Sequence, residues 1–138
     1  MNREIKFRAQ RTDTKEFVYG YYRENTFFDL FGNMPEEVYT KHFIGSFDNI
    51  NLFDGIFEQV EVIPETVGQF TGKLDDNRKE IFEGDIVVDI IGKHYSVEWN
   101  DDTCKYQLSD GSDLNDNDRY GTYLVVIGNI YENKKLIN

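Results

Sequence analysis

The sequence is poor in several residue types on which small folds often depend. It has a single cysteine, Cys104, in 138 residues, which excludes an internal disulfide framework and fits a reducing compartment. No apolar run approaches the length that spans a bilayer, and the charged N-terminus MNREIKFRAQ has no signal-peptide apolar region. A chain of this length buries roughly 68% of its unfolded surface, enough for a core without disulfides. We therefore expect a cytoplasmic protein made of one domain or two small subdomains.

Positive charge is also scarce. The chain has 15 Lys and Arg against 26 Asp and Glu, a net charge of −11. Nucleic-acid binding needs a basic footprint that displaces counterions, and docking on anionic lipid needs positive charge as well. We therefore expect no direct nucleic-acid binding and no membrane contact.

Aromatic residues are abundant, with 9 Tyr, 11 Phe and 1 Trp, and they favour a pleated, half-buried surface. Residues 4–9 alternate apolar and polar side chains strictly, as a half-buried strand does. An Asn, Pro and two Glu over 33–37 are typical of a short helix start. Further strands are expected at 17–22, with Gly20 marking a bulge or close approach, and at 26–31, 38–44, 56–63, 85–91, 94–99, 104–108 and 122–131.

This pattern predicts an all-β fold with few short helical turns. The glycines and the proline of 64–80 mark the most probable seam, so we expect an N-terminal β subdomain over 1–66 and a C-terminal one over 67–138. Short strands at hairpin spacing in the second are typical of a small SH3-like barrel. The apolar run 85–91 is typical of a strand buried on both faces, and Cys104, Tyr106 and Leu108 are expected to share one face.

The stretch TGKLDDNRKEIFEGDIV, 71–87, raises the question of a phosphate loop. Such a loop has four residues between its glycines, a Ser or Thr after the lysine, and a following helix. Only three residues separate Gly68 from Gly72, Leu74 follows Lys73, and no long helix is expected. The motif therefore fails.

The same stretch has the chemistry of a hairpin turn. Asn77 tolerates a left-handed backbone, and its neighbour Arg78 stands where glycine is usual. If Arg78 takes a positive φ, the cost is on the order of 1 kcal/mol, and a longer, bulged loop would avoid that cost. Glu83-Gly84-Asp85 then gives a tight entry into the next strand, so we interpret the stretch as architectural.

A second acidic stretch partly matches a calcium loop. Asp113, Asn115 and Asn117 occupy positions 1, 3 and 5. Position 6 is Asp118 where the turn needs glycine, and position 12 is Leu124 where a bidentate glutamate belongs. We expect a solvated loop, with weak cation binding at 110–118 left open.

Residues for nucleophilic catalysis are few. A Cys104–His94 pair would join a thiol to a base, but Cys104 is expected to pack as a small hydrophobe. His42 is the only other histidine, so His and Cys alone do not complete a closed zinc site. Acidic residues are too abundant to single out a carboxylate pair. We predict no catalytic, cofactor-binding or metal-binding residues.

The first strand has a basic side. Lys6, Arg8 and Arg11 suit an acidic partner, including the acidic part of another copy of the chain. A solvated face with intramolecular ion pairs is the competing interpretation, because surface pairs are common and weak.

Three segments together resemble the YopX family of phage and prophage proteins: REIKFRAQ, VIPETVGQFTGKLDDNRKEIFEGDIV and VIGNIYENKKLI. The family typically has Trp at Gln10, Gly at Arg78 and Pro-Glu at Lys134-Lys135. The resemblance implies an all-β fold with an irregular N-terminal part and an SH3-like C-terminal barrel. It implies no catalytic residues.

We therefore expect a non-enzymatic phage or prophage accessory protein that acts through protein contacts and self-associates as a homo-oligomer. Its aromatic β surface and many sheet edges favour this function. Two alternatives stay open. One is an acidic DNA mimic that inhibits a host DNA-binding protein; the other is a small hydrolase that uses carboxylates or Cys104.

Overall fold

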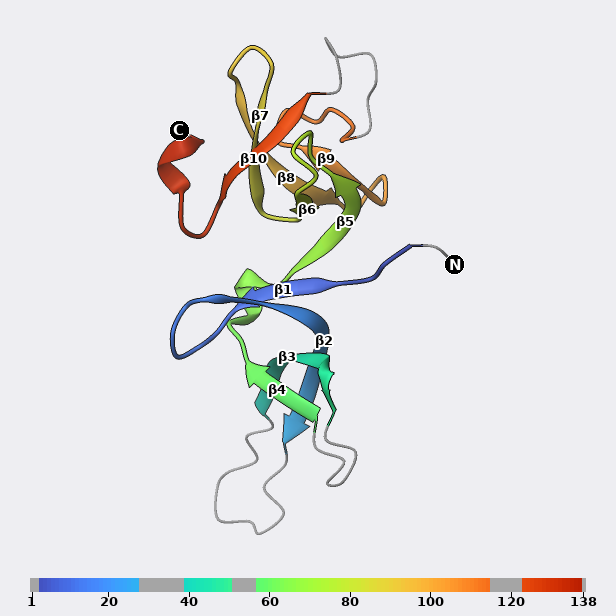
Figure 1. Cartoon of the computed structure of the whole chain (residues 1–138), viewed down its shortest axis with the longest axis vertical. Helices are drawn as coiled ribbons and strands as arrows, with labels where there is room; N and C mark the ends of the chain where they lie inside the picture. Colours follow the sequence, from blue (N-terminus) through green and yellow to red (C-terminus); the bar gives the residue numbers. More distant parts are fainter. Residues whose placement is uncertain (1–2, 28–38, 51–56, 115–122, 138) are drawn as a thin grey trace. The chain divides into compact units, whose positions relative to one another are not determined.

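The computed structural model describes residues 3–27, 39–50, 57–114 and 123–137. The chain divides into two compact units, one of residues 6–67 and one of residues 1–5 with 68–138 (Figure 1). The described residues form strands and two 3-10 turns, which confirms the predicted all-β fold. None of the helical segments among them has the length and apolarity to cross a membrane.

The unit of residues 6–67 is an antiparallel sheet with strand order β4-β3-β2-β1. Its core comprises Ala9, Ile44 and Val62, with Phe7, Val18, Tyr22 and Val67 packed against them. Its elements are β1 (Phe7–Gln10), β2 (Phe17–Phe27), β3 (Tyr39–Ile50), β4 (Phe57–Glu61) and the 3-10 turn η1 (Pro64–Thr66). The strand expected at 26–31 is the end of β2 as far as Phe27; the rest of it, and the helix start at 33–37, lie outside the described residues.

Strand β1 departs from simple alternation. Ala9 faces the core as predicted, but Arg8 is only 5% exposed, and its guanidinium carbon lies 4.8 Å from the centroid of the Phe17 ring. The interpretation of the basic side as solvated is therefore wrong for Arg8, because an aromatic ring takes part of the place of water. Arg11 follows the expected pattern, since it forms an ion pair with Asp13 at 2.8 Å.

Gly20 brings β2 and β3 together. A Cβ atom at this position would lie 2.1 Å from the carbonyl oxygen of Gly45, and Gly20 has φ +155°. Only glycine fits this approach of two backbones, which confirms the predicted close approach.

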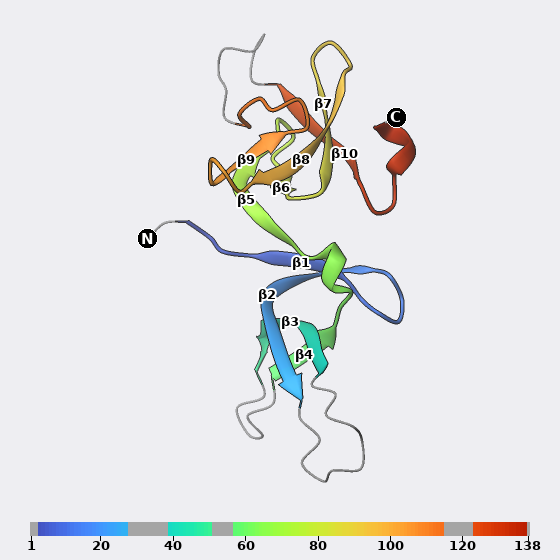
Figure 2. The ribbon, with the colours of Figure 1, turned by 180° about the vertical axis from the view of Figure 1, so that it is seen from behind.

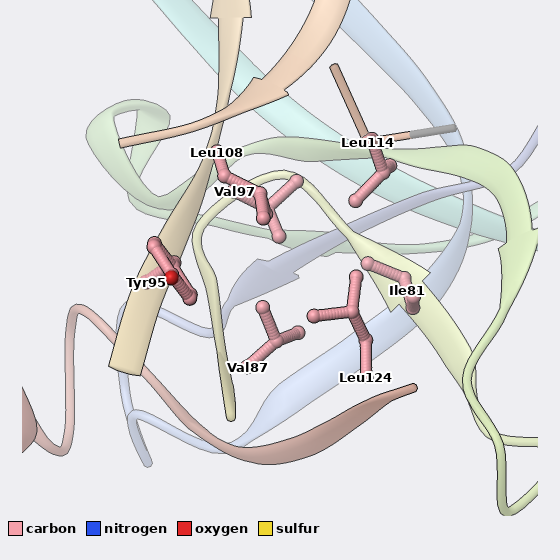
Figure 3. Packing of buried hydrophobic residues seen from close by; sticks show 7 residues of the cluster. All are labelled: Ile81, Val87, Tyr95, Val97, Leu108, Leu114 and Leu124. Atoms are coloured by element: carbon pink, nitrogen blue, oxygen red, sulfur yellow. The ribbon is translucent and has the colours of Figure 1, made fainter. Parts of the chain in front are cut away.

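The second unit combines a hairpin with a four-stranded antiparallel sheet of order β10-β7-β8-β9 (Figure 2). Seven buried side chains from its strands and loops point toward one another in its core (Figure 3). The sheet is open within the described residues, so closure into an SH3-like barrel stays a prediction. The elements are β5 (Gly68–Leu74), β6 (Glu80–Phe82), β7 (Asp85–Asp89), β8 (His94–Asn100), β9 (Lys105–Leu108), β10 (Leu124–Asn129) and the 3-10 turn η2 (Lys134–Leu136).

Two strand predictions in this unit need correction. The apolar run 85–91 is not one doubly buried strand: β7 ends at Asp89, and Ile91 is 77% exposed at the hairpin tip. The Asp89 carboxylate accepts hydrogen bonds from the amides of Ile91 and Lys93, and this turn chemistry overrides apolarity. Cys104 likewise lies before β9, exposed and with φ +53°, so it does not share the buried face of Leu108.

Candidate functional site

The carboxylate of Asp75 organises the turn between β5 and β6. Asp75 is 7% exposed. Its Oδ1 accepts hydrogen bonds from the amides of Asn77 and Lys79, both at 2.8 Å, and its Oδ2 accepts one from the amide of Val126 at 2.9 Å. One carboxylate therefore fixes the turn and fastens it to β10.

The neighbouring residues have structural roles too. Asp76 Oδ2 accepts a hydrogen bond from the Leu124 amide at 2.6 Å, and the Asp76 amide donates to the Leu124 carbonyl at 3.0 Å. Lys73 Nζ donates to the Leu114 carbonyl at 2.7 Å, an intramolecular contact unlike that of a phosphate-loop lysine. Arg78 has φ +64°, so it adopts the left-handed conformation, one of the two possibilities that the sequence left open.

The turn Glu83-Gly84 launches β7. The buried Asp85 carboxylate accepts a hydrogen bond from the Phe82 amide at 2.8 Å, which closes the turn. Gly84 has φ +87°, and a Cβ there would lie 3.0 Å from the Tyr131 ring. The stretch 71–87 is therefore built as a hairpin that runs into an interior strand.

The segment after β10 is a second ordered turn. Asn129 Oδ1 accepts hydrogen bonds from the amides of Tyr131 and Glu132, both at 3.0 Å. Asn133 Oδ1 accepts one from the Asn129 amide at 3.1 Å, and a Cβ at Gly128 would lie 2.5 Å from that oxygen. The Gly-Asn of this segment is therefore required by packing and turn geometry.

The structure does not bring Cys104 and His94 together. His94 begins β8, six residues before Asn100, which pairs with Lys105 beside Cys104. Six residues of strand span about 20 Å. The His94 Nδ1 is also 2.6 Å from the Leu136 carbonyl, to which it donates.

His42 lies in a small polar cluster on the core side of the first unit's sheet. The Tyr22 hydroxyl donates to Glu24 Oε1 at 2.7 Å and lies 2.5 Å from His42 Nδ1. Because the hydroxyl has one proton, Nδ1 must donate to the Tyr22 oxygen. Burial and the hydrogen bond to Glu24 raise the pKa of Tyr22 to about 12, so the hydroxyl keeps its proton at neutral pH.

The partial calcium loop falls mostly outside the described residues, which include Asp113 but not Asn115, Asn117 or Asp118. Asp113 Oδ2 lies 3.5 Å from Lys105 Nζ, and Leu124 begins β10. Within the described ranges, no three His, Cys, Asp or Glu side chains are grouped so as to hold a metal ion.

A cleft of about 1090 Å³ opens in the second unit, between β5 and the β8–β9 hairpin. Trp99 and Tyr106 are cross-strand partners on its wall, with ring centroids 4.9 Å apart in an edge-to-face arrangement. The Tyr106 hydroxyl donates to Gln69 Oε1 at 3.2 Å. The lining includes Arg3, Glu4, Trp99, Cys104, Lys105 and Tyr106.

The electrostatics beside the cleft are unusual. Burial raises the pKa of Glu83, and the charge of Asp101 raises it further, although a backbone hydrogen bond from Gln69 opposes them. Burial also raises the pKa of Tyr106, and the charge of Glu83 adds to this effect while Arg3 lowers it. The sequence indicated that Val97 and Trp99 share one face of their strand and that Tyr106 and Leu108 share one face of theirs. It did not indicate that Glu83, from a different turn, comes near Tyr106.

The chain is similar to known proteins along nearly its whole length. The family model described as "YopX protein" matches residues 6–138, which confirms the resemblance based on three segments. Among solved structures, the crystal structure of protein EF1440 from Enterococcus faecalis matches with a TM-score of 0.56 and 24% identity, over 99% of this chain and 100% of that one. At this identity the likeness shows the fold alone. No curated protein matches the chain.

Proposed function

Because the chain belongs to the YopX family, we propose that it is a non-enzymatic phage or prophage accessory protein that self-associates through the first unit. In this chain, the residues of the family motifs form turns and pack the core. One observation carries this proposal. A single face of β2 and β3 is aromatic and has no acidic side chain, in a chain with 26 acidic residues.

This aromatic face comprises the odd-numbered residues of β2, 17–27, and those of β3 from 39 to 45. The register pairs Phe27 with Tyr39, and their rings stack with centroids 5.3 Å apart. Tyr21 and Tyr39 are each 51% exposed. The core residues Val18 and Ile44 lie on the opposite side, at even-numbered positions.

The charges of the aromatic face favour a second copy as the occupant. Two copies with a net charge of −11 each repel one another in general, so they associate best where unneutralised acids are few. Glu61 of β4 lies beside the aromatic face, where its register partner is Phe43, and Lys41 neutralises it. Of the two cations on the aromatic face, Lys41 is paired with Glu61 of β4 at 3.3 Å, and Arg23 offers a partner for an acid on the other copy. Tyrosine and phenylalanine are enriched at the centres of such interfaces, and two-fold dimers are the commonest arrangement.

The double variant Phe27→Ser/Tyr39→Ser tests the proposal. We expect it to weaken self-association at least tenfold in analytical ultracentrifugation, because it removes two aromatic anchors. The control Ile91→Ser removes an exposed apolar side chain of the second unit and should leave association unchanged. Equal effects of both variants would refute the assignment to the aromatic face. The DNA-mimic and hydrolase alternatives stay predictions, since no particular contact favours them.

A further inference from the structure

In the cleft of the second unit, the apolar face of β8 and β9 extends past the buried core and is exposed among the described residues. On β8 and β9, the pair Val97 and Leu108 is fully buried. The next pair on the same face is Trp99 and Tyr106, and Trp99 is 41% exposed. A tryptophan on the core side of a sheet is a large apolar surface in contact with water, typical of a binding site.

The shape and residue types of the cleft suit a peptide. Its volume of about 1090 Å³ lies at the upper end of small-molecule pockets. Trp, Tyr and Arg, the residues that most often dominate protein–protein binding energy, all line it as Trp99, Tyr106 and Arg3. An extended segment with proline fits an open aromatic groove because it is already ordered before binding.

Charge selects what the segment carries. The unit of residues 1–5 and 68–138 has nine basic and fifteen acidic residues, a net charge of −6. Glu83 adjoins the cleft through Gln69, because the Glu83 amide donates to the Gln69 carbonyl at 3.0 Å and the Tyr106 hydroxyl donates to Gln69 Oε1 at 3.2 Å. Glu4 lines the cleft itself, and carboxylates at these positions favour an arriving cation. A guanidinium group also stacks on Trp and Tyr rings, which an ammonium group does less well.

Two cations that line the cleft, Lys105 and Arg3, are also compatible with an extended segment. Lys105 already lies 3.5 Å from Asp113, and the exposed Arg3 has its Nε 4.0 Å from where a Cβ at Gly72 would lie. Both groups are donors only, so they suit the backbone carbonyls of an extended segment.

We propose that this cleft docks an extended, arginine-containing segment of another protein, whose guanidinium group stacks on Trp99 and Tyr106 beside Glu83. The proposal names a partner class for the interaction role given above and rests on that role. The site is separate in sequence from the aromatic face of the first unit.

Two residues that occur once in the chain report directly on the cleft. Trp99 is the single tryptophan and Cys104 the single cysteine, and both line it. A short synthetic peptide of alternating arginine and proline, titrated to about 1 mM, should change Trp99 fluorescence, protect it from acrylamide and slow alkylation of Cys104. Matched peptides with lysine or glutamate in place of arginine are the controls.

The arginine peptide should bind about threefold or more tightly than the lysine peptide, because stacking adds to charge, and the glutamate peptide should not bind. Glu83→Gln should weaken binding several-fold and reduce its salt dependence, whereas Glu98→Gln, on the opposite face of β8, should not. Trp99→Ala removes the fluorescence reporter, so binding to this variant is measured by alkylation of Cys104. We expect Trp99→Ala to lose at least tenfold in affinity for the arginine peptide and Tyr123→Ala to lose none.

Equal binding of arginine and lysine peptides would show a general attraction of cations to an acidic protein and would overturn the proposal. Unchanged reporters with the arginine peptide would overturn it as well. The same titration on Phe27→Ser/Tyr39→Ser separates the two proposals, since that variant lacks the aromatic face but retains the cleft.

Discussion

Replacing Asp75 with alanine should destabilise the second unit by about 3 kcal/mol. The side chain is almost fully buried and accepts three backbone hydrogen bonds, from Asn77, Lys79 and Val126. The Val126 amide lies within β10 and loses a charge-assisted bond of about 1.5–3 kcal/mol. The two turn amides regain water more easily, so each contributes about 0.5–1 kcal/mol.

Trp99 fluorescence in a urea titration is a suitable assay, because the single tryptophan lies in the same unit as Asp75. Amide exchange of Val126 adds a local measurement and should become much faster in the variant. Asp102→Ala removes an exposed carboxylate from the same unit and should change stability by no more than about 0.5 kcal/mol. If Asp75→Ala were no worse than Asp102→Ala, with Val126 still protected, the structural role of the carboxylate would be refuted.

Three further predictions concern backbone conformation and charge. Arg78→Gly should stabilise the second unit by about 0.5–1 kcal/mol in the same titration, because it relieves a left-handed conformation; a loss of stability would contradict this. Gly20→Ala should lower the stability of the first unit by about 3 kcal/mol, measured by near-ultraviolet circular dichroism. The control Gly111→Ala, whose Cβ would meet no atom within 4 Å, should lower the stability of the second unit by about 1 kcal/mol. Similar losses in the two variants would exclude the steric explanation. Glu83→Gln should match the parent below about pH 4.5, the unfolded-state pKa, and become the more stable of the two as pH rises through the raised folded-state pKa. The reason is that burial disfavours the ionised carboxylate in the folded state, and a pH-independent difference would contradict it.

Residue patterning predicted most of the strands because their signals are local. The alternation at Tyr95, Val97 and Trp99 gave one face of β8, and the structure agrees. The pause at Gly128 in β10 is a register shift between Val126 and Gly128. The turn residues left two possibilities at Arg78, a positive φ or a longer, bulged loop, and the structure has the positive φ.

Long-range contacts were beyond such patterns. Nothing in the sequence near Asp75 indicates that its carboxylate binds an amide 51 residues away. Arg8 alternates as a surface residue does, yet it is buried over Phe17. Ile91 belongs to an apolar run, yet the carboxylate of Asp89 places it on a hairpin tip. In each case a group at another position in the chain decided the outcome.

The candidate site was the least predictable part. Trp99 and Tyr106 could be assigned to one face, but the cleft also needs β5 and Arg3, which lie far away in the sequence. Cys104 was expected in the core and is instead an exposed residue of the cleft, because the chain turns before β9 begins.

The mass of the unmodified chain in solution tests the central claim most directly. Light scattering over a concentration series up to tens of micromolar should give a mass that rises above 16.3 kDa toward a multiple of it, as a micromolar self-association requires. A mass that stays at 16.3 kDa throughout would contradict self-association, whatever the second unit binds.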